Sequence, residues 1–175
     1  MINTIQAALA PYYLYIKFVH VLAVMAWIWS TAVAYAFYLV PIFKAWRRNP
    51  QDPEVREMRN WALERFDHGV SYEHIAFPVI LVTGVLLYIT AGFNTSINWL
   101  LLKLLIVTGI LIPIEVWDYH LSHFGGNKRR IRESGAGALA YEKAVHQHWW
   151  FLLLTSPTVM IFGILVVFLA ISKPF

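Results

Sequence analysis

The sequence has 175 residues, of which 59% are hydrophobic and 14% are charged, with a formal net charge of +4. A typical soluble domain is only about 45–50% apolar and about 25% charged, so the composition excludes a disordered chain and an ordinary soluble enzyme. The absence of cysteine excludes disulfides, thiolate zinc sites and cysteine-ligated iron–sulfur clusters. We expect one membrane domain over residues 1–175, with lipid as its solvent.

Four apolar stretches are long enough to cross a hydrocarbon core about 30 Å thick. They predict transmembrane helices over residues 11–43, 70–93, 99–119 and 148–172. Between the first two, Asp52 can cap a helix that has Pro53 at its first position and Glu54 in its first turn. Residues 53–68 then alternate charged and apolar positions, which predicts an amphipathic cytoplasmic helix that lies at the interface or extends the second span. The predicted fold class is an all-α, four-helix membrane bundle.

The basic residues indicate an orientation. Eleven of the 14 lysines and arginines lie within residues 44–74 and 124–145. Because basic loops stay in the cytoplasm, we expect both termini to face outward. We expect an integral protein of a bacterial inner membrane that contacts lipid and no nucleic acid, with homo-oligomerisation through small residues on the helix faces as an option.

Placing an ionisable side chain within a membrane span costs free energy, so each such residue is a candidate for a functional role. The outer half carries Lys17 and His20, which share one face of the first helix, and Lys103 in the third helix; Trp27 lies about two turns beyond His20. The two lysines either extend to the outer interface or form a cationic pocket for an anionic ligand such as porphyrin propionates. His20 cannot reach the interface as easily as a lysine can.

The inner end carries six of the seven histidines, together with several carboxylates. Helix bundles build cofactor and metal sites from side chains on facing helices, which leaves two cofactors open. One is a b-type heme held by His20, or by His74 paired with His120 or His148. The other is non-heme iron, copper or zinc, because two histidines and a carboxylate suit such metals. Its candidate ligands are His74, His120, His123, His146, His148, Glu73, Glu115 and Asp118. A non-catalytic subunit with interfacial histidines is the third alternative.

Several short motifs resemble those of the HemJ-type protoporphyrinogen IX oxidases, a family of membrane proteins with four or more helices. They are Lys17-x-x-His20 followed by Trp27, the sequence Trp99-Leu100-x-x-Lys103, Pro157-Thr158, and the ending Lys173-Pro174-Phe175. The resemblance implies a divergent relative that binds heme b and either oxidises a porphyrinogen or passes electrons to a quinone or a partner protein. Only His20, Trp27 and Lys103 can be carried over from the family residue by residue.

Overall fold

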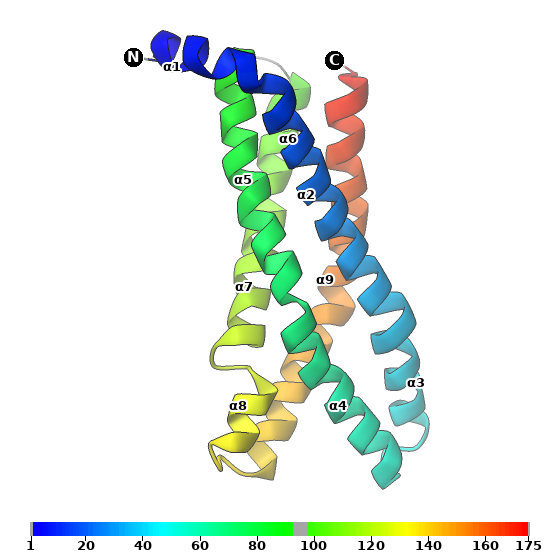
Figure 1. Cartoon of the computed structure of the whole chain (residues 1–175). Coiled ribbons are helices and arrows are strands. Elements are labelled where there is room, and N and C mark those ends of the chain that lie inside the picture. The colour runs from blue at the N-terminus through cyan, green and yellow to red at the C-terminus, as the bar shows by residue number, and fades with distance from the viewer. Residues whose placement is uncertain (1, 93–97, 175) are drawn as a thin grey trace.

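The computed structural model describes residues 2–92 and 98–174, and it is an elongated bundle of helices (Figure 1). The helices are α1 (Ile2–Leu9), α2 (Tyr13–Val33), α3 (Val40–Arg48), α4 (Pro53–Gly69), α5 (Ser71–Ala91), α6 (Asn98–Ile106), α7 (Ile112–His123), α8 (Lys128–Glu133) and α9 (Ala138–Ser172). None of the described residues forms a strand. The prediction of an all-α fold is therefore confirmed.

Four segments of the described chain are long and apolar enough to cross a membrane, as the sequence predicts. They are Thr4–Arg48, Pro53–Ala91, Asn98–Glu133 and Ala138–Ser172. Their outward faces carry large apolar side chains: Leu14, Phe18 and Trp29 are 73%, 66% and 74% exposed. A monomeric soluble protein rarely exposes so many large apolar side chains, so these four helices suit an integral membrane protein, and their outward faces are consistent with contact with lipid.

Two of the four segments contain a wider, π-helical turn, one at Ala34–Leu39 and one at Val107–Leu111. Each turn comes directly before a proline, Pro41 or Pro113, in the first turn of the helix that follows. A proline has no N–H to donate, and its ring would clash with the carbonyl one turn earlier. The wider turn accommodates this clash and lets each segment continue as one helix.

The connection between the first two spans begins with the predicted cap. The Asp52 carboxylate accepts hydrogen bonds from the backbone N–H of Glu54 at 2.9 Å and of Val55 at 3.4 Å. The helix α4 that follows buries Arg59, Ala62, Leu63 and Asp67 on one face and runs into α5 through Val70. It therefore extends the second span and packs against α3, α7 and α8.

The observed helix ends differ from the predicted ones mainly at the charged end of the bundle. Helix α7 continues to His123, and α9 begins at Ala138 instead of near His148. The extra turns of α9 bury Tyr141, Ala144 and Val145, so packing of this face stabilises helix beyond the apolar stretch. The predicted end of the second helix at residue 93 lies outside the described residues.

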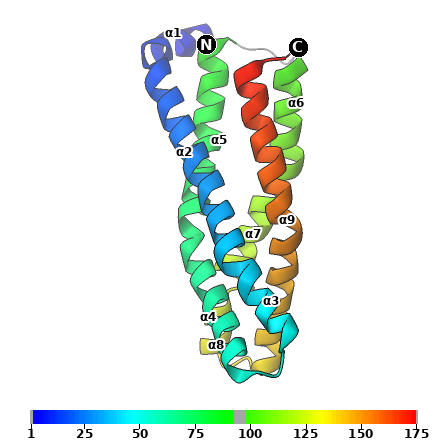
Figure 2. The ribbon, with the colours of Figure 1, turned by 90° about the vertical axis from the view of Figure 1, so that its right-hand side faces the viewer.

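The two ends of the bundle have different character (Figures 1 and 2). The first residues of α1 and the last residues of α9 lie together at one end, which we call the terminal end. The junction of α3 with α4, the short helix α8 and the start of α9 lie at the opposite end, which we call the basic end. An apolar core in the terminal half is built around Trp27, Phe77, Trp99, Leu100 and Leu111. A second apolar core, containing Leu63, Val145 and Trp149, lies in the basic half.

Candidate functional site

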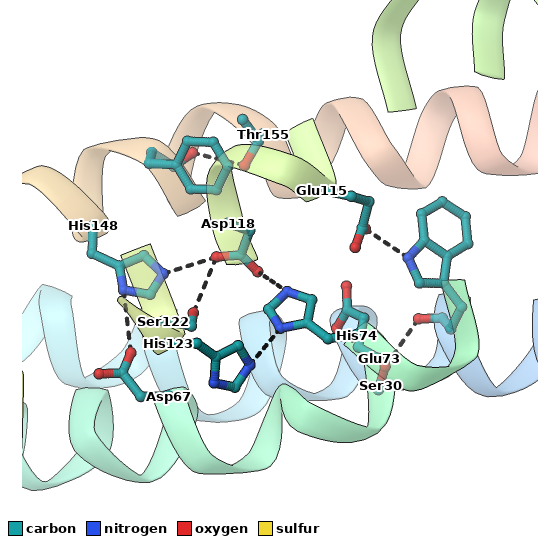
Figure 3. A network of polar contacts seen from close by, with 12 residues as sticks. Ser30, Asp67, Glu73, His74, Glu115, Asp118, Ser122, His123, His148 and Thr155 are labelled. Atoms are coloured by element: carbon teal, nitrogen blue, oxygen red, sulfur yellow. Dashed lines mark hydrogen bonds and ion pairs between the residues drawn. The ribbon is translucent and has the colours of Figure 1, made fainter. Parts of the chain in front are cut away.

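A set of polar side chains, most of them buried, lies between these two apolar cores, and Figure 3 labels most of its members. Its members come from α2, α4, α5, α7, α8 and α9, and we call it the polar network. They are Trp27, Ser30, Asp67, Glu73, His74, Glu115, Asp118, Ser122, His123, Lys128 and His148. Polar groups buried in a membrane span mark functional sites by default, because burying them is costly.

Asp118 of α7 lies at the centre of the polar network. One of its oxygens, Oδ1, lies 3.0 Å from His148 Nε2 of α9 and accepts a hydrogen bond from Ser122 at 3.4 Å. The other oxygen, Oδ2, lies 3.4 Å from His74 Nε2 of α5. The carboxylate therefore bridges two imidazoles from different helices, and Figure 3 shows it between their rings.

Lys128 closes the polar network at the basic end. Its side chain is fully buried and its Nζ lies 2.6 Å from Asp67 Oδ1, while its backbone N–H donates to Asp67 Oδ2 at 3.0 Å. Nζ of Lys128 also contacts His148 Nδ1, and this ring nitrogen of His148 lies 3.4 Å from Asp67 Oδ1. Asn127 caps α8 by accepting a hydrogen bond from the backbone of Arg130, so the helix begins with its first residue inside the bundle.

His123 connects the polar network to a cleft. Its Nε2 lies 2.8 Å from His74 Nδ1. The cleft has a volume of about 1030 Å³ and lies at the basic end, among α4, α8 and the first turn of α9. His123 and Asp67 both line this cleft, together with positively charged arginines and negatively charged glutamates. The cleft therefore borders two members of the polar network, of which His123 is half-buried and Asp67 is buried.

Two glutamates form the part of the polar network farthest from the basic end. Glu115 of α7 accepts a hydrogen bond from the Trp27 indole Nε1–H at 2.7 Å. Glu73 of α5 lies 3.2 Å from the Ser30 hydroxyl, which also lies 3.0 Å from the Trp27 carbonyl oxygen. Both glutamates are 6% exposed, and beyond them lies the apolar core that contains Trp27 and Phe77.

The six histidines that the sequence places at the inner end fall into two groups in the structure, one inside the polar network and one exposed. His74, His123 and His148 belong to the polar network. His120 is exposed and packs on Phe124, and His146 is exposed and packs on Trp150. His68 is exposed as well. The carboxylates Glu73, Glu115 and Asp118 all face the network, as the candidate site requires.

The observed positions of the histidines and carboxylates can be compared with the ligand sets predicted for a metal ion and for heme. In the described part of the chain, no three histidine or carboxylate side chains are arranged to hold a metal ion. Asp118 lies between His74 and His148 and contacts both rings. The structure therefore brings His74 and His148 to the same carboxylate, whereas His120 is exposed and lies outside the polar network.

The outer-half candidates lie apart from the polar network, with one exception. Lys17 is exposed and Lys103 is half-buried. His20 is half-buried against α5, where its Nδ1 lies 2.8 Å from the Thr83 hydroxyl. The ring packs closely against Gly84, where an added Cβ would lie 3.4 Å from it, in ordinary van der Waals contact. Trp27 is the exception, since its indole N–H donates to Glu115 of the polar network.

The sequence interpretation missed four members of the site, namely Ser30, Asp67, Ser122 and Lys128. Lys128 is one of five basic residues between positions 124 and 145, and such a cluster is typical of a solvated loop. Asp67 lies in a helix rich in charges of both signs. The turn Gly125-Gly126-Asn127 does predict where α8 starts, because asparagine is a favourable helix N-cap. The cap gives no indication that Lys128, which follows it, is buried.

Comparison with family models, curated proteins and solved structures found no match to this chain.

Proposed function

We propose that this protein transfers protons between the cleft at its basic end and carboxyl groups inside the membrane. The basic loops favour a cytoplasmic location for the cleft. The observation that carries the proposal is the unbroken set of contacts from His123 and Asp67, which line the cleft, to Asp118. Alternating imidazoles and carboxylates can each accept one proton and release another, which is how membrane proteins build proton relays.

The hydrogen-bond roles support a relay through His148. A lysine ammonium group only donates, so His148 Nδ1 presents its lone pair to Lys128. The ring proton of neutral His148 is then on Nε2, which donates to Asp118 Oδ1 at 3.0 Å. A proton that arrives at Asp67 can pass to Lys128 as Lys128 gives one of its own to His148 Nδ1, and His148 then releases its Nε2 proton to Asp118, so that Lys128 and His148 end in the states in which they began and Asp118 ends protonated.

A second branch runs through His123. If His123 Nε2–H donates to His74 Nδ1, then His74 carries its proton on Nε2, facing the Asp118 carboxylate at 3.4 Å. The opposite assignment would aim a lone pair at the carboxylate. A water proton that binds His123 Nδ1 allows the Nε2 proton to pass to His74. His74 then gives its own Nε2 proton to Asp118, so each ring ends neutral and Asp118 ends protonated.

The polar network stops inside the bundle. Beyond Glu73 and Glu115 lies the apolar core with Trp27, Phe77 and Leu111, whose buried members among the described residues are all hydrophobic. A continuous polar path would let protons leak across the membrane, whereas a path that ends at an apolar layer loads a proton at a defined depth. We therefore infer a proton-loading path that serves chemistry or transport within the membrane.

Proton exchange at His74 tests the relay. Protein with isotope-labelled histidine is placed in lipid nanodiscs, and exchange of the His74 ring N–H with water is measured by NMR. The variants are His123→Gln and His148→Gln, singly and together, because glutamine keeps a hydrogen bond but does not titrate. The double variant should exchange about tenfold or more slowly, and each single variant only partly so because the other branch remains.

His146→Gln is the matched control, since His146 is exposed and lies two residues from His148 on the same helix. Its exchange rate should equal that of the wild type. The relay is refuted if the double variant exchanges as fast as this control while its helicity by circular dichroism is unchanged.

A heme-binding membrane oxidoreductase is a second candidate, and one contact favours it. The Thr83 hydroxyl donates to the Val79 carbonyl oxygen at 2.5 Å, so it can only accept from His20 Nδ1–H. Neutral His20 then presents the Nε2 lone pair, the arrangement found in metal-binding histidines whose other nitrogen is held by a partner. A bound heme would supply one-electron transfer, and His20 would be its ligand.

Absorption spectra of the purified protein test this candidate. A reduced-minus-oxidised spectrum should show the bands of a b-type heme, and His20→Ala should abolish them. His68→Ala changes an exposed histidine outside both sites and should leave the bands intact. Protein that shows no heme bands after expression with added heme would rule out this candidate without affecting the proton relay.

A further inference from the structure

Glu115 lies where the polar network meets the apolar core, and one of its two carboxyl oxygens has no partner. The residue is 6% exposed. Its Oε1 accepts the indole N–H of Trp27 at 2.7 Å. Its Oε2 is buried and has no hydrogen-bond partner among the described residues. The carboxyl group therefore receives a single, uncharged donor.

These contacts suit a neutral carboxylic acid better than a carboxylate. A carboxylate carries charge on both oxygens, so a buried one needs several donors or a cation to replace the water it has lost. In a protonated Glu115 the carbonyl oxygen accepts from Trp27, and the other oxygen carries one O–H. An unpaired neutral O–H costs less free energy than an unpaired, charged oxygen in the same buried position.

The spans supply no cation at this depth. The apolar parts of all four spans lack aspartate, glutamate, histidine, lysine and arginine, over residues 21–43, 75–91, 104–114 and 149–172. The buried lysine of the polar network, Lys128, is held by Asp67 at 2.6 Å. Its charge is therefore compensated at the basic end and is not available to Glu115.

The ionisable neighbours of Glu115 disfavour a further negative charge. Glu73 of α5 accepts a hydrogen bond from the Ser30 hydroxyl at 3.2 Å, and Asp118 follows Glu115 by one turn of α7. Both carboxylates act on Glu115 through their negative charge. The nearest imidazole, His74, has its Nε2 3.4 Å from Asp118, so it stabilises that carboxylate instead. Adjacent carboxyl groups in a poorly solvated site do not all ionise.

We infer that Glu115 is the last proton-binding group of the polar network and carries a proton on Oε2 at neutral pH. The inference rests on the proposed function for the route by which the proton arrives, whereas the protonated state rests on the contacts of Glu115 itself. The ligand of the site is a proton, and its recipient is a base that reaches this depth in the membrane. The Oε2–H bond breaks as the base takes the proton, and the carboxylate left behind takes a replacement from protonated Asp118.

Infrared spectroscopy tests the assignment. Purified protein in lipid at neutral pH should show the carbonyl stretch of one buried, protonated carboxylic acid, and the band should move to lower frequency in deuterated water. Glu115→Gln keeps an acceptor for the indole N–H and should remove the band, whereas Glu73→Gln should retain it. Glu57→Gln changes an exposed carboxylate of α4 and is the control, with no effect on the band.

Trp27→Phe provides a test that leaves every carboxyl group in place. It removes the N–H that binds the carbonyl oxygen, so the band should rise in frequency. An unchanged frequency would overturn the placement of the proton on Oε2. A band that survives in Glu115→Gln and is lost in Glu73→Gln would place the proton on Glu73 and overturn the assignment.

A wild-type spectrum without the band would mean that Glu115 is ionised, with or without a bound cation, and would also overturn the inference. None of these results changes the exchange rates that the relay predicts at His74. Conversely, a relay that fails in the exchange experiment leaves the Glu115 band in place. The two proposals can therefore fail separately.

Discussion

Lys128 and Asp67 form an ion pair that is almost completely removed from solvent, with exposed side-chain fractions of 0% and 2%. Replacing one partner of a buried pair leaves the other charge uncompensated, which typically costs about 3–5 kcal/mol of unfolding free energy. For Lys128→Met we expect the lower end of this range. Asp67 would still accept the backbone N–H of residue 128 at 3.0 Å, and His148 lies 3.4 Å away to take up a compensating proton.

Asp67→Asn should cost more than Lys128→Met. The ammonium group of Lys128 would then be buried with no carboxylate within ion-pair distance among the described residues, since Asp67 is its partner. The double variant Asp67→Asn/Lys128→Met removes both charges at nearly constant volume. Because burying an ion pair is itself close to neutral or unfavourable, we expect the double variant to be about as stable as the wild type, with a coupling energy of several kcal/mol.

Unfolding of the purified protein by sodium dodecyl sulfate in mixed micelles, followed by circular dichroism, measures these differences. The control pair is Arg129 and Glu133, which lie 2.7 Å apart on the same helix α8 but are 71% and 58% exposed. Arg129→Met should leave stability unchanged, because exposed pairs contribute little. The reasoning is refuted if Lys128→Met costs no more than Arg129→Met, or if the double variant is as unstable as Asp67→Asn.

Two further predictions concern the positioning of the sites. Gly126→Ala would place a Cβ 2.8 Å from the Leu121 Cα, and because backbone must move we expect a loss of about 1–3 kcal/mol. The same unfolding assay should show no loss for Gly69→Ala, where nothing lies within 4 Å of the added carbon. Thr83→Val removes the acceptor for His20 Nδ1–H, so heme affinity should fall by about 10–100-fold in a heme titration, and an unchanged affinity would contradict that role.

The four spans could be predicted from the sequence because the length of an apolar stretch is a local property. The extensions of α7 and α9 could not. Residues 138–147 include charged and polar positions, and their helicity depends on burying Tyr141 and Val145 against other helices. Likewise, the Asp52 cap is encoded locally, whereas the direction in which α4 leaves it depends on the packing of Leu63.

The depth of the site could be predicted, but not the directions of its side chains. Histidines and carboxylates at helix ends of similar depth had to lie near one another. His120 and His123 are three residues apart and could share a face, yet Asp118 defines the buried face of α7 and His120 lies about 200° around the helix from it. His123 is the last residue of α7, where the chain turns, and its ring reaches His74.

The same residue types suit a metal site and a proton path, and the donor arrangement favours the second. A metal ion needs several lone pairs directed at one point. In the polar network the lone pairs are directed at the protons of neighbours: His148 Nδ1 faces Lys128, and Asp118 faces the nitrogens of His148 and His74. Four carboxyl groups and one lysine leave the network with excess negative charge, which attracts a cation. A proton neutralises one carboxylate at a time, so it does not need several ligands directed at one point, and it can then pass to the next group.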